Sequence, residues 1–110
     1  MTGHAELASG RWRTLTLAEQ LANAGADVGR AIRAKDAGNA TRFEAALDRA
    51  LELLDLTMAD PRWAGPRLRE IARTREVVCD FLVGDNDYGS TAETLEGYFM
   101  AFALASRRDR

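Results

Sequence analysis

The chain is 110 residues long, which suits one domain with its own hydrophobic core. Its hydrophobic fraction of 46% and charged fraction of 29% are ordinary for a globular protein, and a net charge of −2 gives no overall attraction to nucleic acid or anionic membrane. The single cysteine, Cys79, excludes an intrachain disulfide. With only one histidine, His4, beside it, the chain also lacks the ligands for a zinc or di-iron site of its own.

Residues 1–12 mix Gly, Ser, His and Thr and are predicted to form a flexible segment ahead of a single domain, 13–110. They contain no apolar core of the kind a secretory signal has, and no apolar run in the chain reaches the ~20 residues of a membrane span. We therefore expect a cytoplasmic protein without membrane contact, which the lone cysteine also favours because thiols persist in reducing compartments.

The first helix is expected over residues 14–35. Apolar side chains repeat there at helical spacing and form one stripe: Leu17, Leu21, Val28 and Ile32. Gly25 and Gly29 lie beside this stripe, although each glycine weakens a helix by about 1 kcal/mol relative to alanine. We interpret them as a place where a neighbouring helix approaches closely, the alternative being a kink.

The second helix is expected over residues 41–59, where Thr41 and Glu44 have the spacing of a capping box. It carries the strongest apolar stripe of the chain: Phe43, Leu47, Ala50, Leu51, Leu54 and Met58. Leu53 and Leu56 fall outside this stripe.

The third helix is expected over residues 66–83, because Pro66 suits the first turn of a helix. The fourth is expected over residues 91–107, after a turn and a second capping box formed by Ser90 and Glu93. Its stretch 97–105 is apolar all round, which predicts burial on more than one side. Together the four segments predict an all-α fold, an antiparallel four-helix bundle of the up-down type.

Four apolar residues lie off the main stripes of the second and fourth helices: Leu53, Leu56, Met100 and Leu104. Since one face of each helix fills the core of a bundle, extra apolar faces suggest a second burial surface. We take these residues as the partner-binding surface of a non-enzymatic interaction module, adaptor- or chaperone-like, which forms a homodimer or holds an amphipathic helix of another protein. The alternative is that the fourth helix is simply central.

Arg75 places a charge inside the apolar stripe of the third helix, so it requires a carboxylate or carbonyl partner. Asp55 is a candidate, because it lies near the stripe of its own helix. One hypothesis is a small-ligand or enzyme site anchored by Arg75, Asp55 and Asp80. The plainer interpretation is a structural ion pair.

A basic patch follows the second helix and suggests an RNA-binding alternative. Arg62, Arg69 and Arg73 supply positive charge, and Trp63 supplies a ring on which a base can stack. Acidic residues interleave with these arginines, however, and favour a solvated, ion-paired surface.

Two further motifs lead to no site. Asp85, Asp87, Glu93 and Glu96 match positions 1, 3, 9 and 12 of an EF-hand loop, but position 6 is Ser90 where glycine is required. Cys79 has no histidine base near it and is expected to pack against apolar neighbours. We therefore predict no catalytic residue, no metal site and no cofactor.

Two sequence stretches, REVVCDF at 75–81 and GDNDYGSTAE at 84–93, resemble small bacterial proteins of unassigned function over residues 46–107. This resemblance implies a small helical protein and brings no activity. The number and size of the helices are also similar to those of flagellar export chaperones, which hold a partner's helix against a bundle. That likeness concerns architecture alone.

Overall fold

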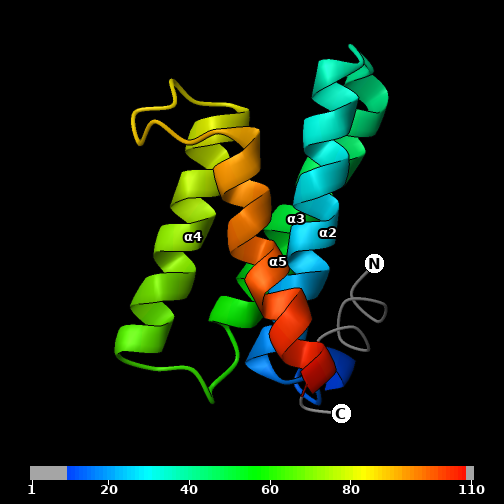
Figure 1. Ribbon diagram of the computed structural model, residues 1–110. Coiled ribbons are helices and arrows are strands. Elements are labelled where there is room, and N and C mark those ends of the chain that lie inside the picture. Colours follow the sequence, from blue (N-terminus) through cyan, green and yellow to red (C-terminus); the bar gives the residue numbers. More distant parts are fainter. Residues whose placement is uncertain (1–9, 109–110) are drawn as a thin grey trace.

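The computed structural model describes residues 10–108, and this range is all-α, without a strand (Figure 1). Residues 10–12 are helical. Four long helices follow: α2 (Leu17–Asp36), α3 (Ala40–Met58), α4 (Pro66–Leu82) and α5 (Ala92–Arg108). The all-α prediction and the positions of the four expected helices are confirmed.

Helix α2 is the central element, because both α3 and α5 pack extensively against it, whereas α4 makes fewer contacts and lies at the edge (Figure 1). The core residues of the described chain come mainly from α2 and α3, and the largest fully buried ones include Leu21, Val28 and Leu54. The alternative that the fourth helix is central is therefore wrong. Only Leu95 and Phe99 of α5 are buried.

Helix α2 passes through both glycines without a break. A Cβ atom on Gly25 would lie 2.4 Å from the Cβ of Phe99, so the two helices meet here at a distance that only glycine permits. This confirms the predicted close approach at Gly25. Gly29 is different: a Cβ there would meet the guanidinium of Arg33 at 3.3 Å, within its own helix.

The helix caps correct two predictions. Helix α3 begins one residue earlier than expected, because the Asn39 side chain, rather than Thr41, accepts the backbone N–H of Arg42 at 3.1 Å. Helix α5 is capped by Thr91, whose hydroxyl accepts the backbone N–H of Thr94 at 3.0 Å, instead of by Ser90. In both cases another residue with a capping side chain lay within two positions, and spacing alone did not distinguish them.

We expect Thr91→Ala to lower the free energy of unfolding by about 1 kcal/mol, because it removes the acceptor that caps α5. Ser90→Ala is the matched control, since the Ser90 hydroxyl makes no hydrogen bond to the described chain. Urea denaturation of both variants measures the difference. An equal loss in the two variants would contradict the cap at Thr91.

Trp12 corrects the expected flexible segment 1–12. Its side chain is 7% exposed and belongs to the core, and its indole Nε1 donates to the Thr57 hydroxyl at 3.0 Å. The folded domain therefore includes residue 12. Gly10 and Arg11 are helical and exposed, and the part of that prediction that covers residues 1–9, together with His4, lies outside the described range.

Candidate functional site

The most exposed apolar surface of the described helices follows α5. Met100 and Leu104 are 56% and 51% exposed, whereas Phe99, which directly precedes Met100, is buried against α2. Gly97 and Ala101 are also exposed. The positions 97, 100, 101 and 104 share one helical face, so they form a continuous strip, which we call the α5 stripe.

Gly97 lies in this stripe with nothing within 4 Å of the position a Cβ would take. The contrast with Gly25 is informative, because Gly25 is required by the contact with Phe99 inside the chain. A glycine in a helix interior costs about 1 kcal/mol relative to alanine. No contact within the described chain accounts for that cost at Gly97.

Charged residues stand at the two ends of the α5 stripe. Glu93 lies in the first turn of α5 and Arg108 in the last, four residues beyond Gly97 and Leu104 respectively, so both share the face of the stripe. Both are exposed, and neither forms an ion pair with the described chain.

The other two residues expected in the partner-binding surface lie on α3. Leu53 is 7% exposed and packs in the core cluster that contains Trp12, so it is not a surface residue. Leu56 is half-buried against the same cluster. Because α3 and α5 each pack against α2, the structure does not bring these leucines together with Met100 and Leu104.

Arg75 has the partner predicted for it: its Nε donates to the Asp55 carboxylate at 2.7 Å, which joins α4 to α3. This pair is partly exposed, and it raises the pKa of the Arg75 guanidinium through the hydrogen bond to Asp55.

Asp80 is not part of the pair. Its carboxylate accepts the backbone N–H groups of Asp87 and Tyr88 at 2.8 and 3.1 Å and so fixes the loop before α5. Cys79 is half-buried on α4.

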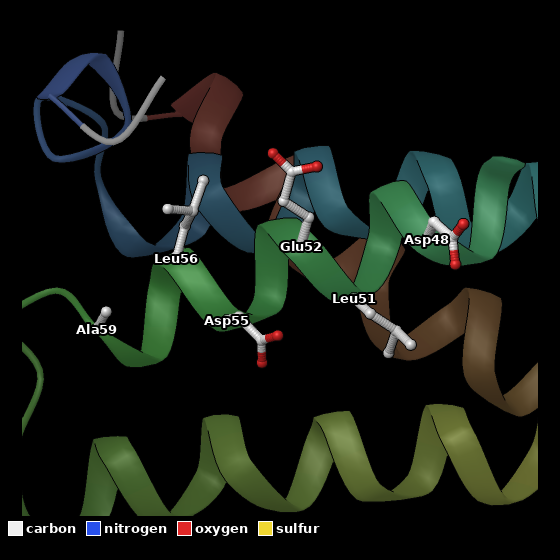
Figure 2. Close-up of a pocket in the computed structure, with 6 residues that line it drawn as sticks. All are labelled: Asp48, Leu51, Glu52, Asp55, Leu56 and Ala59. Carbon is white, nitrogen blue, oxygen red and sulfur yellow. The ribbon is translucent and has the colours of Figure 1, made fainter. Parts of the chain in front are cut away.

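A shallow hollow of about 540 Å³ runs along α3 beside this ion pair (Figure 2). It is lined by Asp48, Leu51, Glu52, Asp55, Leu56 and Ala59. Leu51 and Asp55 project from α3 toward α4, whereas Glu52 and Leu56 project from the opposite side, so the lining side chains do not converge (Figure 2). Arg75 is not among them. The described chain has no buried side-chain nitrogen or oxygen that lacks a hydrogen-bond partner for a ligand to satisfy.

The residues of the RNA-binding alternative separate into two pairs. Arg62 and Trp63 are used inside the chain, since Arg62 bonds to Asp60 at 2.7 Å and its guanidinium lies 4.6 Å from the centre of the Trp63 ring. Arg69 and Arg73 are exposed on α4. Within residues 10–108, no hydrogen bond, ion pair or ring contact joins the two pairs.

Sequence reasoning missed a buried polar network between the start of α2 and the loop after α3. Asp60 is 1% exposed, and Gln20 is fully buried. The Gln20 amide donates to Asp60 at 3.0 Å and to the Trp12 carbonyl at 2.9 Å, and its oxygen accepts the indole N–H of Trp63 at 2.8 Å. The network thus ties three separate stretches of chain together.

Arg62 neutralises the buried carboxylate. Its backbone N–H and Nε donate to one oxygen of Asp60 at 3.0 and 3.1 Å, and its Nη2 donates to the other oxygen. Nη2 also donates to the Leu15 carbonyl at 2.7 Å. The hydrogen bonds from Arg62 hold the pKa of the Asp60 carboxyl well below its ordinary value, despite the opposing effect of burial. Asp60 and Gln20 are buried, whereas the Arg62 side chain is partly exposed, so the network ties the chain together from the protein surface inward.

No family model matches the chain, and neither a curated protein nor a solved structure matches it. Among the described residues, no three His, Cys, Asp or Glu side chains gather in a way that could hold a metal ion. The helices of that range are each too short or too polar to cross a membrane.

Proposed function

We propose that the protein is a non-enzymatic protein-interaction module, adaptor- or chaperone-like, whose contact surface is the α5 stripe. The observation that carries the proposal is the exposure of Met100 and Leu104 at helical spacing on the outer side of a helix whose inner side is buried. Full burial of such a side chain stabilises a complex by about 1.5–3 kcal/mol, so this pair supplies a substantial driving force for association.

The mode of contact follows from the spacing. Anchors at 97, 100, 101 and 104 have the i, i+3, i+4, i+7 pattern through which one helix packs against another. Met100 adds an adaptable side chain, which suits a binding surface. Leu53 and Leu56 are left out of this surface, because they pack in or against the core.

Two further parts of the proposal concern context. We infer that the four helices form an antiparallel up-down bundle with α2 at its centre, since consecutive helices are joined by short turns and α3 and α5 share α2 as a packing partner. We also place the protein in the cytoplasm, where the half-buried thiol of Cys79 would stay reduced.

Site-specific photo-cross-linking tests the proposal. A benzophenone amino acid at position 101 lies in the α5 stripe, and the same amino acid at position 69, exposed on α4, is the matched control. In extract of the source cells we expect a cross-linked product from position 101 and none from position 69. Its mass distinguishes a second copy of the chain from another protein.

A second variant makes the outcome specific to the apolar stripe. Met100→Glu should abolish the cross-link from position 101 while the circular dichroism spectrum stays unchanged, because Met100 is exposed and its replacement leaves the core intact. Cross-linking that is equal at positions 101 and 69, or that survives Met100→Glu, would contradict the proposed surface.

A further inference from the structure

We infer that the occupant of the α5 stripe is a second copy of this chain, and that the two α5 helices pair in antiparallel orientation about a two-fold axis between Met100 and Ala101. This inference rests on the proposed function and names its partner. It follows from three properties of the stripe: its side-chain sizes, its end charges and its symmetry.

The side-chain sizes are self-complementary in this register. With the axis between residues 100 and 101, Gly97 faces Leu104 of the second copy, and Met100 faces Ala101 of the second copy. Each large side chain thus meets a small residue, which is the arrangement that lets two helices approach closely and still fill the space between them. The open space around Gly97 is where the leucine of the second copy would lie.

The end charges select the antiparallel orientation. In the same register Glu93 faces Arg108 of the second copy, and the symmetry produces this contact twice. A parallel pair would instead place Glu93 beside Glu93 and Arg108 beside Arg108, which is unfavourable. Neither residue has an ion-pair partner within residues 10–108, so no ion pair in that range competes with the contact.

The symmetry closes the assembly. A two-fold contact uses the same patch on both copies, so the dimer buries both stripes and leaves no second apolar surface on α5 to recruit a third chain. The exposed methionine and leucine of each copy are then covered, which explains their presence on the outer side of a helix.

Sedimentation equilibrium at low ionic strength tests the register through charge reversal. We expect a wild-type dimer, and roughly tenfold weaker self-association for Glu93→Arg or Arg108→Glu, because each reversal creates two like-charge contacts in a homodimer. Glu44→Arg is the matched control, since it reverses an exposed carboxylate on α3. It should leave the dissociation constant unchanged.

An equimolar mixture of the two single variants makes the decisive comparison. In the mixed dimer every end contact joins an arginine to a glutamate, so association should return to the wild-type level. Glu93→Arg/Arg108→Glu in one chain should restore it as well. If neither the mixture nor the double variant recovers association, the register is overturned. Stronger association when Glu93→Arg is mixed with wild type would indicate a parallel pair and would also overturn it.

The two proposals fail separately. A wild-type chain that stays monomeric at every concentration overturns the homodimer. If position 101 nevertheless cross-links to another protein in extract, the α5 stripe remains an interaction surface with a different occupant. A chain that stays monomeric and gives no cross-link from position 101 overturns both proposals.

Discussion

Asp60→Ala is expected to lower the free energy of unfolding by about 3 kcal/mol, because hydrogen bonds to a buried carboxylate are lost and the buried Gln20 amide loses an acceptor. The carboxylate is 1% exposed and accepts hydrogen bonds from Gln20 and from three nitrogen atoms of Arg62. Its removal leaves the buried Gln20 amide with one acceptor, the Trp12 carbonyl, and releases the arginine that holds the Leu15 carbonyl.

Urea denaturation measures this loss, and Asp55→Ala provides the matched control. Asp55 also bonds to an arginine at 2.7 Å, but its side chain is more than half exposed, so its removal should cost about 0.5 kcal/mol. Similar losses for the two variants would mean that the network around Asp60 contributes no more than a surface ion pair.

The pH dependence of the same proteins gives a second readout. Because the pKa of folded Asp60 lies below its ordinary value of 3.8, its stabilising effect is complete well above that value and is lost as the pH falls below about 4. Asp60→Asn cannot lose this contribution. Its stability should therefore decline less steeply than that of the wild type as the pH is lowered below 4.

Gly25→Ala is expected to destabilise the protein by about 2 kcal/mol, the cost of overpacking a tight contact. The added Cβ would lie 2.4 Å from the Cβ of Phe99 and 2.6 Å from its Cγ, and a Cβ atom cannot swing away as the end of a long side chain can. Helix α5 must then move off α2, which loosens the second-largest helix contact of the fold.

Gly29→Ala, on the same helix, is the matched control. Both substitutions gain about 1 kcal/mol of helix propensity, but at position 29 the new methyl group meets the flexible end of Arg33. We therefore expect Gly29→Ala to be neutral or stabilising in thermal denaturation. If Gly25→Ala also stabilised the protein, the two helices could not lie as close as the structure places them.

The spacing of apolar residues along the sequence predicted the helices well. Apolar spacing located all four helices to within a few residues. Asp55 was a candidate partner for Arg75 because a charged side chain within an apolar stripe requires an oppositely charged or polar partner. The close helix approach at Gly25 was correctly predicted, because a glycine destabilises a helix unless it serves a contact that a larger residue would prevent. Each of these inferences began from the residue pattern within a single helix.

The features that were missed depend on contacts between distant residues. Gln20 and Asp60 are 40 positions apart, and nothing in either local pattern shows that they meet. A signal was nevertheless present: Gln20 precedes Ala24 and Val28 at intervals of four, which is the buried face of α2. A polar residue on a buried face calls for a partner.

Two of the four residues predicted for the partner-binding surface lie on the exposed surface, and the other two do not, because contacts between distant residues cover them. Met100 and Leu104 were identified from their place off the main stripe, and they are exposed. Leu53 had the same pattern but is covered, because the segment with Trp12 packs against that side of α3. Periodicity reports how many apolar faces a helix has, whereas the tertiary packing decides which of them remains open.

The most direct test of the α5 stripe as a contact surface is the rate at which peroxide oxidises Met100. Met58, half-buried on α3, is an internal reference within the same molecule. We expect Met100 to be oxidised fast in dilute protein, and several-fold more slowly in concentrated protein or in extract, while the rate at Met58 stays constant. A Met100 rate that is the same under all three conditions would contradict the account, because the stripe would then remain open to solvent.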